Sequence, residues 1–220
     1  MEEKDHRIWT IVSAVELMMA AIVILLDLLV PTLIILAMMV VSLIVRKEKL
    51  SSLGFKKLGK PGRVFLIVLV LVIVWTVLHL SIFIPVSSHL TGTTQDLSAY
   101  EELKGNVGQL VFLLIATWTL AAFGEEFVYR GYIQKRVRDV LGDTKVAIIV
   151  AVAVTSLLFG AAHLEQGTVG FILTAIDAVF FSALKLKYDD NLWASIFAHG
   201  LSNTVGMIAV FFVGPIYGLW

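Results

Sequence analysis

Three groups of polar residues interrupt otherwise apolar stretches of this 220-residue chain. In chain order they are Glu125-Glu126 with Arg130, Phe159 with His163, and His199 with Asn203. Ionisable side chains are costly inside a bilayer, and they usually face a protein interior or a wet cavity with a function. Two carboxylates, two imidazoles and an amide can together activate water and hydrolyse an amide bond. The residue types therefore favour a hydrolytic site.

The first group, EEFVYR, contains two carboxylates with different expected surroundings. Glu126 precedes Arg130 by four residues, which is the favoured order for an ion pair along a helix. Glu125 points about 100° away on the same helix and has no comparable partner. Such an unpaired carboxylate suits a general base. The alternative is a structural salt bridge at a helix end, and this motif alone does not separate the two.

The second and third groups each place two side chains on one helical face. Phe159 would form the wall of a cavity into which His163 points, and the small residues 160–162 allow close helix contact. His199 and Asn203 also share a face, and their N–H groups can stabilise an oxyanion. For both groups the alternative is polar hydrogen bonding between helices.

The composition indicates a membrane protein. Hydrophobic residues make up 59% of the chain and the mean hydropathy is +0.92, against roughly 45–50% apolar residues in soluble domains. We expect an all-α, polytopic transmembrane bundle of seven to eight spans that encloses a polar cavity, in a single membrane-embedded domain over residues 1–220. Lys+Arg equals Asp+Glu, so nothing suggests a nucleic-acid partner, and the absence of cysteine excludes thiolate chemistry.

The spans follow from the apolar runs and their breaks. Asp27 and Pro31 divide the run 8–45 into two short helices with a tight turn. An eighth span would require residues 214–220 to fold back. The remaining runs cover 64–86, 107 to the first motif and beyond, 145–163, 168–184 and 192 to about 213.

The distribution of charge predicts the orientation in the cell membrane. Segment 46–63 is strongly basic, and Lys or Arg residues also follow the fourth and sixth spans. These loops and the amino terminus are therefore expected in the cytoplasm. Segment 87–105 contains Lys104 as its only base and is expected outside.

The depth of the motifs in the membrane restricts where the helix of the fourth span can end. If its helix ended at Arg130, Glu125 would lie only about 7 Å below the inner surface, at about 1.5 Å per residue. It could not then meet His163, which would lie near the opposite face. We therefore predict that this helix continues to about Arg138 and that Arg130 is buried.

The order EExxxR, FxxxH and HxxxN, together with DNLWASIFAHGLSN, resembles the CPBP membrane proteases. This CAAX-processing and bacteriocin-processing (Abi) family includes the type II CAAX prenyl endopeptidases. The resemblance covers about 108–213 and implies an intramembrane peptidase with a helical fold and a polar cavity. It implies the following roles by position: Glu125 as the water-activating base, His163 as its helper, His199 and Asn203 at the oxyanion, and Glu126 and Arg130 as supporting residues.

The resemblance leaves the cofactor and substrate open. Glu125, His163 and His199 are a sufficient zinc set, but the spacing is not H-E-x-x-H and we favour no metal. Expected substrates are lipidated (CAAX) proteins or bacteriocin and pheromone peptides, entering from the cytoplasm or laterally from the bilayer. The alternative is a non-catalytic immunity or scaffold protein that binds a peptide in the same cavity. A transporter would be supported by an internal repeat, which we do not find.

Further polar and aromatic residues lie outside the motifs. Asp177, in the sixth span, is expected either to face the cavity and tune the substrate or to pair with a basic neighbour. Trp75 and Trp118 are expected to face lipid or the membrane interface. His79 has no predicted role.

Overall fold

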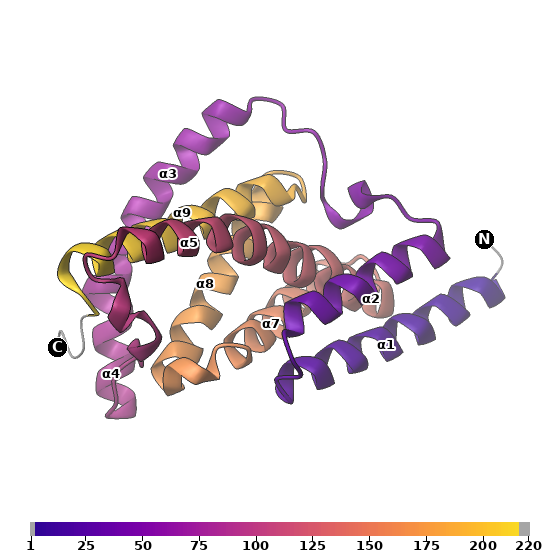
Figure 1. Cartoon of the computed structure of the whole chain (residues 1–220). Helices are drawn as coiled ribbons and strands as arrows, with labels where there is room; N and C mark the ends of the chain where they lie inside the picture. Colours follow the sequence, from indigo (N-terminus) through magenta and orange to yellow (C-terminus); the bar gives the residue numbers. More distant parts are fainter. Residues whose placement is uncertain (1–2, 216–220) are drawn as a thin grey trace.

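The computed structural model describes residues 3–215, and the side chains from Arg7 onward. Within this range the chain is helical and has no strand (Figure 1). The helices are α1 (Glu3–Leu25), α2 (Pro31–Arg46), α3 (Pro61–Leu78), α4 (Ile84–Thr91), α5 (Val107–Ala116), α6 (Gln134–Leu141), α7 (Lys145–Ala161), α8 (Gly167–Lys187) and α9 (Leu192–Val213). Two π-helical segments, His79–Phe83 and Thr117–Ile133, join α3 to α4 and α5 to α6.

The apolar helices identify a multi-pass membrane protein. In the part of the chain that is described, five helical segments are long and apolar enough to cross a bilayer: Arg7–Leu25, Pro61–Thr91, Val107–Leu141, Leu164–Lys187 and Leu192–Val213. Two apolar helices, Pro31–Arg46 and Lys145–Ala161, are shorter. The expected all-helical membrane architecture is confirmed at this level. An eighth span would require residues 214–220 to fold back, and 216–220 lie outside the described residues.

The first two helices form the hairpin that the sequence predicted. Asp27 and Leu29 adopt positive φ angles of 46° and 54° in the connecting turn. Pro31 then occupies the first turn of α2, where a backbone N–H has no helical partner to lose. The buried Arg136 of α6 pairs with Glu16 of α1 and with Glu48 just after α2. These ion pairs fasten the hairpin to α6.

The helix that carries the first motif continues well past Arg130. The segment Val107–Leu141 is one helical span that contains α5, the π-helical segment and α6. This confirms the prediction that it reaches Arg138, and Arg130 is fully buried. The π-helical segment Thr117–Ile133 was not predicted. Such i→i+5 hydrogen bonding is rare and often occurs at functional sites.

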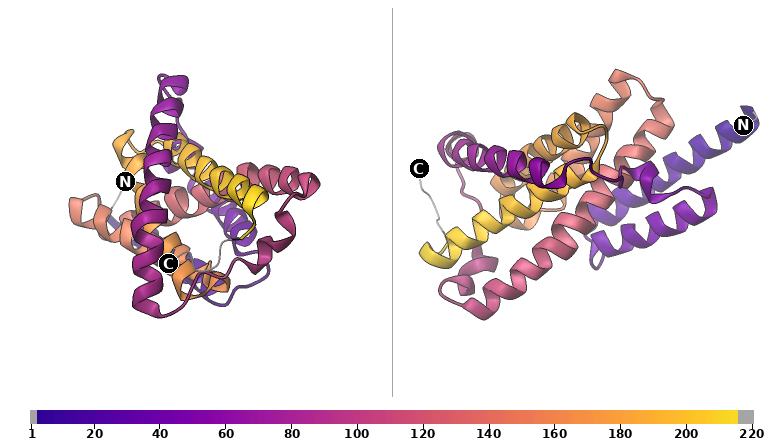
Figure 2. Two further views of the ribbon diagram at one scale, coloured as in Figure 1. Left: turned by 90° about the vertical axis from the view of Figure 1, so that its left-hand side faces the viewer. Right: turned by 90° about the horizontal axis from the view of Figure 1, so that it is seen from above.

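The connections between helices gather at two opposite ends of the bundle (Figures 1 and 2). We call one the basic end; it consists of residues 47–60, 142–144 and 188–191. We call the other the loop end; it consists of residues 26–30, 92–106 and 162–166. The amino-terminal end of α1 is at the basic end, and the carboxyl-terminal end of α9 is at the loop end.

Backbone hydrogen bonds hold each end together. At the basic end, Leu192 N–H donates to the Gly54 carbonyl over 2.9 Å. At the loop end, Asp96 N–H donates to the Gln166 carbonyl, also over 2.9 Å. Segment 92–106 therefore lies against the α7–α8 connection and covers part of this end of the bundle.

Two glycines allow the helices that carry the motifs to approach closely. A Cβ at Gly160 would lie 2.7 Å from the Phe171 carbonyl oxygen, across the α7–α8 contact. A Cβ at Gly200 would lie 2.6 Å from the ring of Trp118. The Trp118 Nε1–H donates to Thr204 Oγ1 on α9. The prediction that Trp118 faces lipid is therefore wrong, because its indole packs between two helices.

Candidate active site

All three motifs contribute to one cavity of about 490 Å³ in the half of the bundle nearer the loop end. Its walls come mainly from α5, the π-helical segment, α8 and α9. The motif residues that line it are Glu125, Phe159, His163, His199 and Asn203. Glu126 and Arg130 lie behind this wall and are fully buried. The fold thus brings together residues that are up to 78 positions apart (Glu125 to Asn203) in the chain.

Glu126 connects the first motif to the third. Its Oε1 lies 3.0 Å from Arg130 Nη1 and 3.0 Å from His199 Nδ1. Because an ionised carboxylate can only accept a hydrogen bond, His199 Nδ1 carries the proton and donates it to Glu126. This contact fixes the orientation of the imidazole. The predicted Glu126–Arg130 pair is present, but the sequence did not indicate that it also holds His199.

The guanidinium of Arg130 makes cation–π contacts with neighbouring aromatic rings. Its guanidinium lies 4.4 Å from the centroid of Phe159 and 5.3 Å from that of Phe181. Cation–π contacts of this kind stabilise a desolvated cation by about 2 kcal/mol or more. Phe181 also stacks on the His199 ring, with centroids 4.9 Å apart. These aromatic contacts help to hold Arg130 and His199 in place, in addition to their contacts with Glu126.

Glu125 has different surroundings, as its position in the motif predicted. Its Oε2 lies 3.9 Å from His199 Nε2, on the ring edge opposite Glu126. Within residues 7–215, this buried oxygen has no hydrogen-bond partner. The side chain is 18% exposed and lines the cavity. A polar contact beyond about 3.5 Å, with an unsatisfied acceptor, leaves room for a bridging water.

His163 enters the cavity from the end of α7. The helix ends at Ala161, two residues earlier than the predicted boundary. His163 Nδ1 lies 2.8 Å from the Phe159 carbonyl oxygen. Since a carbonyl can only accept, Nδ1 donates and Nε2 is the ring nitrogen that is free to accept. The centroid of the Phe159 ring lies 4.6 Å from that of His163 and 5.8 Å from that of His199, so Phe159 contacts both imidazoles.

Several polar residues of the cavity were not found from the sequence, among them Ser202 and Tyr100. Ser202 lines it beside Asn203, and its buried Oγ has no hydrogen-bond partner among the residues described. Tyr100 lines it from the loop end. Burial, together with the negative charges of Glu165 and Glu125, raises the pKa of Tyr100, so its phenol stays protonated and can donate. Ser202 lies within DNLWASIFAHGLSN but not at a spaced motif position, and Tyr100 lies outside all three motifs, so the motif spacings did not indicate either residue.

Asp177 both faces the cavity and has a basic neighbour. It lines the cavity wall on α8, accepts a hydrogen bond from Trp75 Nε1 over 2.6 Å, and lies 2.9 Å from His79 Nε2. Trp75 also stacks on Phe180 with centroids 4.2 Å apart. The prediction that Trp75 faces lipid is therefore wrong. His79 and Trp75 together connect α3 and the adjoining π-helical segment to α8.

The three candidate zinc ligands, Glu125, His163 and His199, do not form a metal-binding group in this structure. Among the residues described, no three His, Asp or Glu side chains are close enough together to hold a metal ion. Glu125, His163 and His199 line the same cavity but do not form such a group. His163 Nδ1 and His199 Nδ1 are also engaged by Phe159 and Glu126.

The fold and the cavity define a class: a multi-pass helical membrane protein with carboxylates and imidazoles in its interior. Residues 107–205 match the family described as Type II CAAX prenyl endopeptidase Rce1-like. This confirms the family resemblance for that part of the chain, which contains all three motifs. The family consists of CAAX endopeptidases and therefore indicates an intramembrane protease with peptide substrates. Comparisons with curated proteins and with solved structures gave no match.

Proposed function

We propose that this protein is an intramembrane endopeptidase in which Glu125 activates a water molecule. Glu125 takes a proton from the water, with His163 helping to position it, and the oxygen attacks the scissile carbonyl. His199 and Asn203 donate hydrogen bonds to the resulting oxyanion. Glu126 and Arg130 hold His199 in place. The candidate reactions are the processing of prenylated (CAAX) proteins and the processing of bacteriocin and pheromone peptides.

The observation that carries this proposal is the arrangement of two glutamates on either side of one imidazole. Glu126 holds Nδ1 of His199, whereas Glu125 presents an unpartnered oxygen near Nε2. For Nε2 to donate to an oxyanion the ring must carry a proton there as well, and the flanking carboxylates are suitably placed to stabilise that cation. Removing one oxyanion donor typically costs about 10²–10³ in rate.

The whole chain is proposed to form a single domain with seven spans. α2 and α7 contain 16 and 17 residues. They would therefore cover about 24–26 Å at about 1.5 Å per residue, slightly less than the roughly 30 Å hydrocarbon core. Such a mismatch is accommodated by local thinning of the bilayer. The basic end would face the cytoplasm.

The test is cleavage of prenylated and unprenylated peptide libraries by the purified protein and by Glu125→Gln. We expect Glu125→Gln to lose at least about 10²-fold in rate, since general bases contribute roughly 10²–10⁴-fold. Glu102→Gln is the matched control, because Glu102 is exposed at the loop end and does not line the cavity. It should cleave at the unmodified rate.

Two results would contradict the proposal. If Glu125→Gln cleaves as fast as Glu102→Gln, then Glu125 is not the base. If neither the unmodified protein nor the variants cleave, yet all keep their biological effect, then a non-catalytic immunity or scaffold protein is the better description. Chelator treatment of the same samples would test the zinc alternative for Glu125, His163 and His199.

A further inference from the structure

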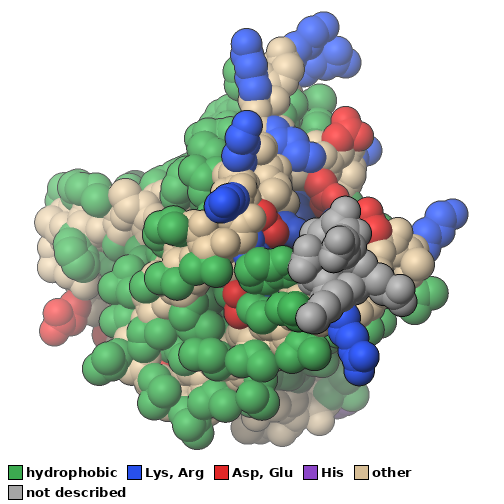
Figure 3. All heavy atoms as spheres, turned by 90° about the vertical axis from the view of Figure 1, so that its right-hand side faces the viewer, with side chains coloured by type: hydrophobic (Ala, Val, Ile, Leu, Met, Phe, Trp, Pro, Cys, Tyr) green, Lys and Arg blue, Asp and Glu red, His purple; other side chains and the backbone are tan. Residues whose placement is uncertain are grey.

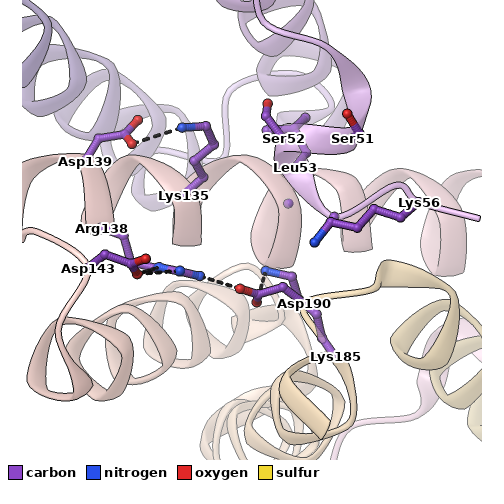
Figure 4. Close-up of a pocket in the computed structure, with 12 residues that line it drawn as sticks. Ser51, Ser52, Leu53, Lys56, Lys135, Arg138, Asp139, Asp143, Lys185 and Asp190 are labelled. Carbon is purple, nitrogen blue, oxygen red and sulfur yellow. Dashed lines mark hydrogen bonds and ion pairs between the residues drawn. The ribbon is translucent and has the colours of Figure 1, made fainter. Parts of the chain in front are cut away.

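The polar pocket at the basic end differs from the cavity of the motifs in the groups that it leaves for a ligand. This pocket of about 370 Å³ is lined largely by charged residues that pair with one another. Figure 4 shows that Arg138 and Lys185 both approach Asp190, and that Lys135 approaches Asp139. Figure 3 shows further Lys and Arg side chains projecting outward from the basic end. The protein itself therefore neutralises most of the charge that lines this pocket.

The cavity, in contrast, contains a hydrogen-bonding group that the fold leaves without a partner, the phenol of Tyr100. Tyr100 is half-buried and lines the cavity. Among the residues described, its hydroxyl makes no hydrogen bond. A phenol can both donate and accept, and the hydroxyl of a buried tyrosine usually has a partner. The Tyr100 hydroxyl is thus available to a molecule that occupies the cavity.

The segment that carries Tyr100, residues 92–106, is attached to the bundle on both sides of this residue. Before it, the Gln95 side chain donates to that of Gln166 in the α7–α8 connection over 2.8 Å. After it, the Gly105 N–H donates to a carbonyl of α9, also over 2.9 Å. Because both sides are held, the position of the phenol relative to α8 and α9 is set by the fold.

The electrostatic surroundings place Tyr100 beside the reacting groups and not among them. Of the two carboxylates whose charge acts on the phenol, Glu165 at the loop end has the larger effect and Glu125, the proposed base, the smaller. His199 and Asn203, the proposed donors to the scissile carbonyl, come from α9. Tyr100 comes from a different segment and supplies a further donor on the loop-end side of the site.

We propose, on the basis of the proposed peptidase function, that Tyr100 is a substrate-binding residue whose phenol donates a hydrogen bond to a main-chain carbonyl of the peptide beside the scissile bond. A main-chain contact does not depend on the side chains of the peptide or on a lipid attached to it, so it serves every candidate substrate. Tyr100 lies outside residues 107–205, which match the family. The contact is therefore supplied by the segment of this chain that precedes the matched region.

Tyr100→Phe tests this proposal because it removes the hydroxyl alone. A hydrogen bond made equally in the bound substrate and in the transition state affects KM and leaves kcat unchanged. We expect KM to rise about three- to tenfold, which is the usual range for a single hydrogen bond. The unfolding temperature should not change, since the hydroxyl has no partner in the protein. Tyr188→Phe is the matched control, because Tyr188 is also half-buried but does not line the cavity.

Three results would overturn the assignment. An unchanged KM in Tyr100→Phe would show that the hydroxyl does not bind the substrate. A fall in kcat at unchanged KM would assign it to the transition state and not to substrate binding. An equal rise of KM in Tyr188→Phe, or a lower unfolding temperature in Tyr100→Phe, would show that the effect comes from the fold.

The partner of the phenol can be identified by changing the peptide. In successive peptides, each amide near the scissile bond is replaced by an alkene, which has the same shape but no carbonyl. Binding is measured to Glu125→Gln with and without Tyr100→Phe, so that no cleavage occurs. At one position, the alkene peptide should bind both proteins equally. If Tyr100→Phe weakens the binding of every alkene peptide, the partner is not a main-chain carbonyl and the proposal is wrong.

The binding measurement also separates this proposal from the peptidase function. If the unmodified protein cleaves no peptide, yet Tyr100→Phe weakens binding to Glu125→Gln, the peptidase function fails and the role of Tyr100 stands. If the unmodified protein cleaves and Tyr100→Phe changes neither KM nor binding, the role of Tyr100 fails alone. If Glu125→Gln binds no peptide and the unmodified protein cleaves none, both fail.

Discussion

Phe159 is a side chain that contacts residues of all three polar motifs. Its ring lies against Arg130 from the first motif, His163 from its own, and His199 from the third. Only 2% of its surface is exposed. The FxxxH pattern therefore combines an aromatic residue that packs the motifs together with an imidazole that reaches the cavity.

Removing one partner of the buried Glu126–Arg130 pair should destabilise the protein more than removing both partners. Arg130→Met leaves Glu126 buried without its cation, and breaking such a pair costs about 3–5 kcal/mol. The double variant Glu126→Gln/Arg130→Met removes both charges and should recover most of this loss. Thermal unfolding of the detergent-purified proteins measures both effects.

Activity should not recover with stability in that double variant. Glu126 also accepts the hydrogen bond from His199 Nδ1, so its loss leaves this ring nitrogen without its charged partner. Peptide cleavage should therefore stay reduced by at least about tenfold. An Arg130→Met variant that melts like the unmodified protein would contradict the structural role assigned to this pair.

At the scale of helices, the close contact between α7 and α8 decides where His163 lies. Gly160 sits three residues before His163 and faces the Phe171 carbonyl across this contact. The backbone of α8 cannot move without shifting Thr174 and Asp177, which line the cavity. The small residue therefore fixes the geometry of the site as well as the packing.

Gly160→Ala should accordingly destabilise the protein. The new Cβ would lie 2.7 Å from a backbone oxygen and 3.1 Å from the Cβ of Ala175, so the two helices must separate. Overpacking of this kind costs about 1–3 kcal/mol. Gly206→Ala on α9 is the matched control, because a Cβ there meets nothing within 4 Å. If both variants have the same unfolding temperature, the close contact is not required.

At the scale of the whole molecule, ion pairs at the basic end hold the bundle closed on one side. Asp190 lies 2.7 Å from Arg138 and 3.2 Å from the buried Lys185, and so connects α6 to the α8–α9 turn. Burial raises the pKa of Asp190, but the charges of Lys185 and Arg138 outweigh this effect and hold the pKa below its ordinary value. The ionised carboxylate is thus favoured by the fold.

This predicts a pH-dependent contribution to stability. Because the folded-state pKa of Asp190 lies below the unfolded value, its contribution is present at neutral pH and is lost as the pH falls through the folded-state pKa. Asp190→Asn should therefore lower the unfolding temperature near neutral pH. The difference from the unmodified protein should disappear in strong acid.

The matched control for that experiment is Asp189→Asn. Asp189 and Asp190 have the same left-handed backbone, with φ of 57° and 58°, so both substitutions are equivalent for the main chain. Asp189→Asn should not reproduce the loss at neutral pH. A difference between Asp190→Asn and the unmodified protein that stays constant with pH would contradict the role of the Asp190 carboxylate.

The sequence by itself determined most of the helical elements and the motif residues of the candidate site. Helix boundaries in a membrane follow from local properties, such as the length of an apolar run and the position of Pro31. The prediction that the fourth span continues past Arg130 also rested on a local quantity, the rise per residue. The motif spacings sufficed to select Glu125, His163, His199 and Asn203, all of which line one cavity.

Only the tertiary structure decided how these residues are connected and which side of the bundle they face. The contact of Glu126 with His199 and the pairing of Asp177 with Trp75 and His79 join helices far apart in the chain, so no local spacing encodes them. Trp75 and Trp118 were misjudged for the same reason, since an aromatic residue in an apolar run can contact lipid or another helix. Which end the cavity opens toward depends on the packing of all the helices, because that packing determines where space remains between them.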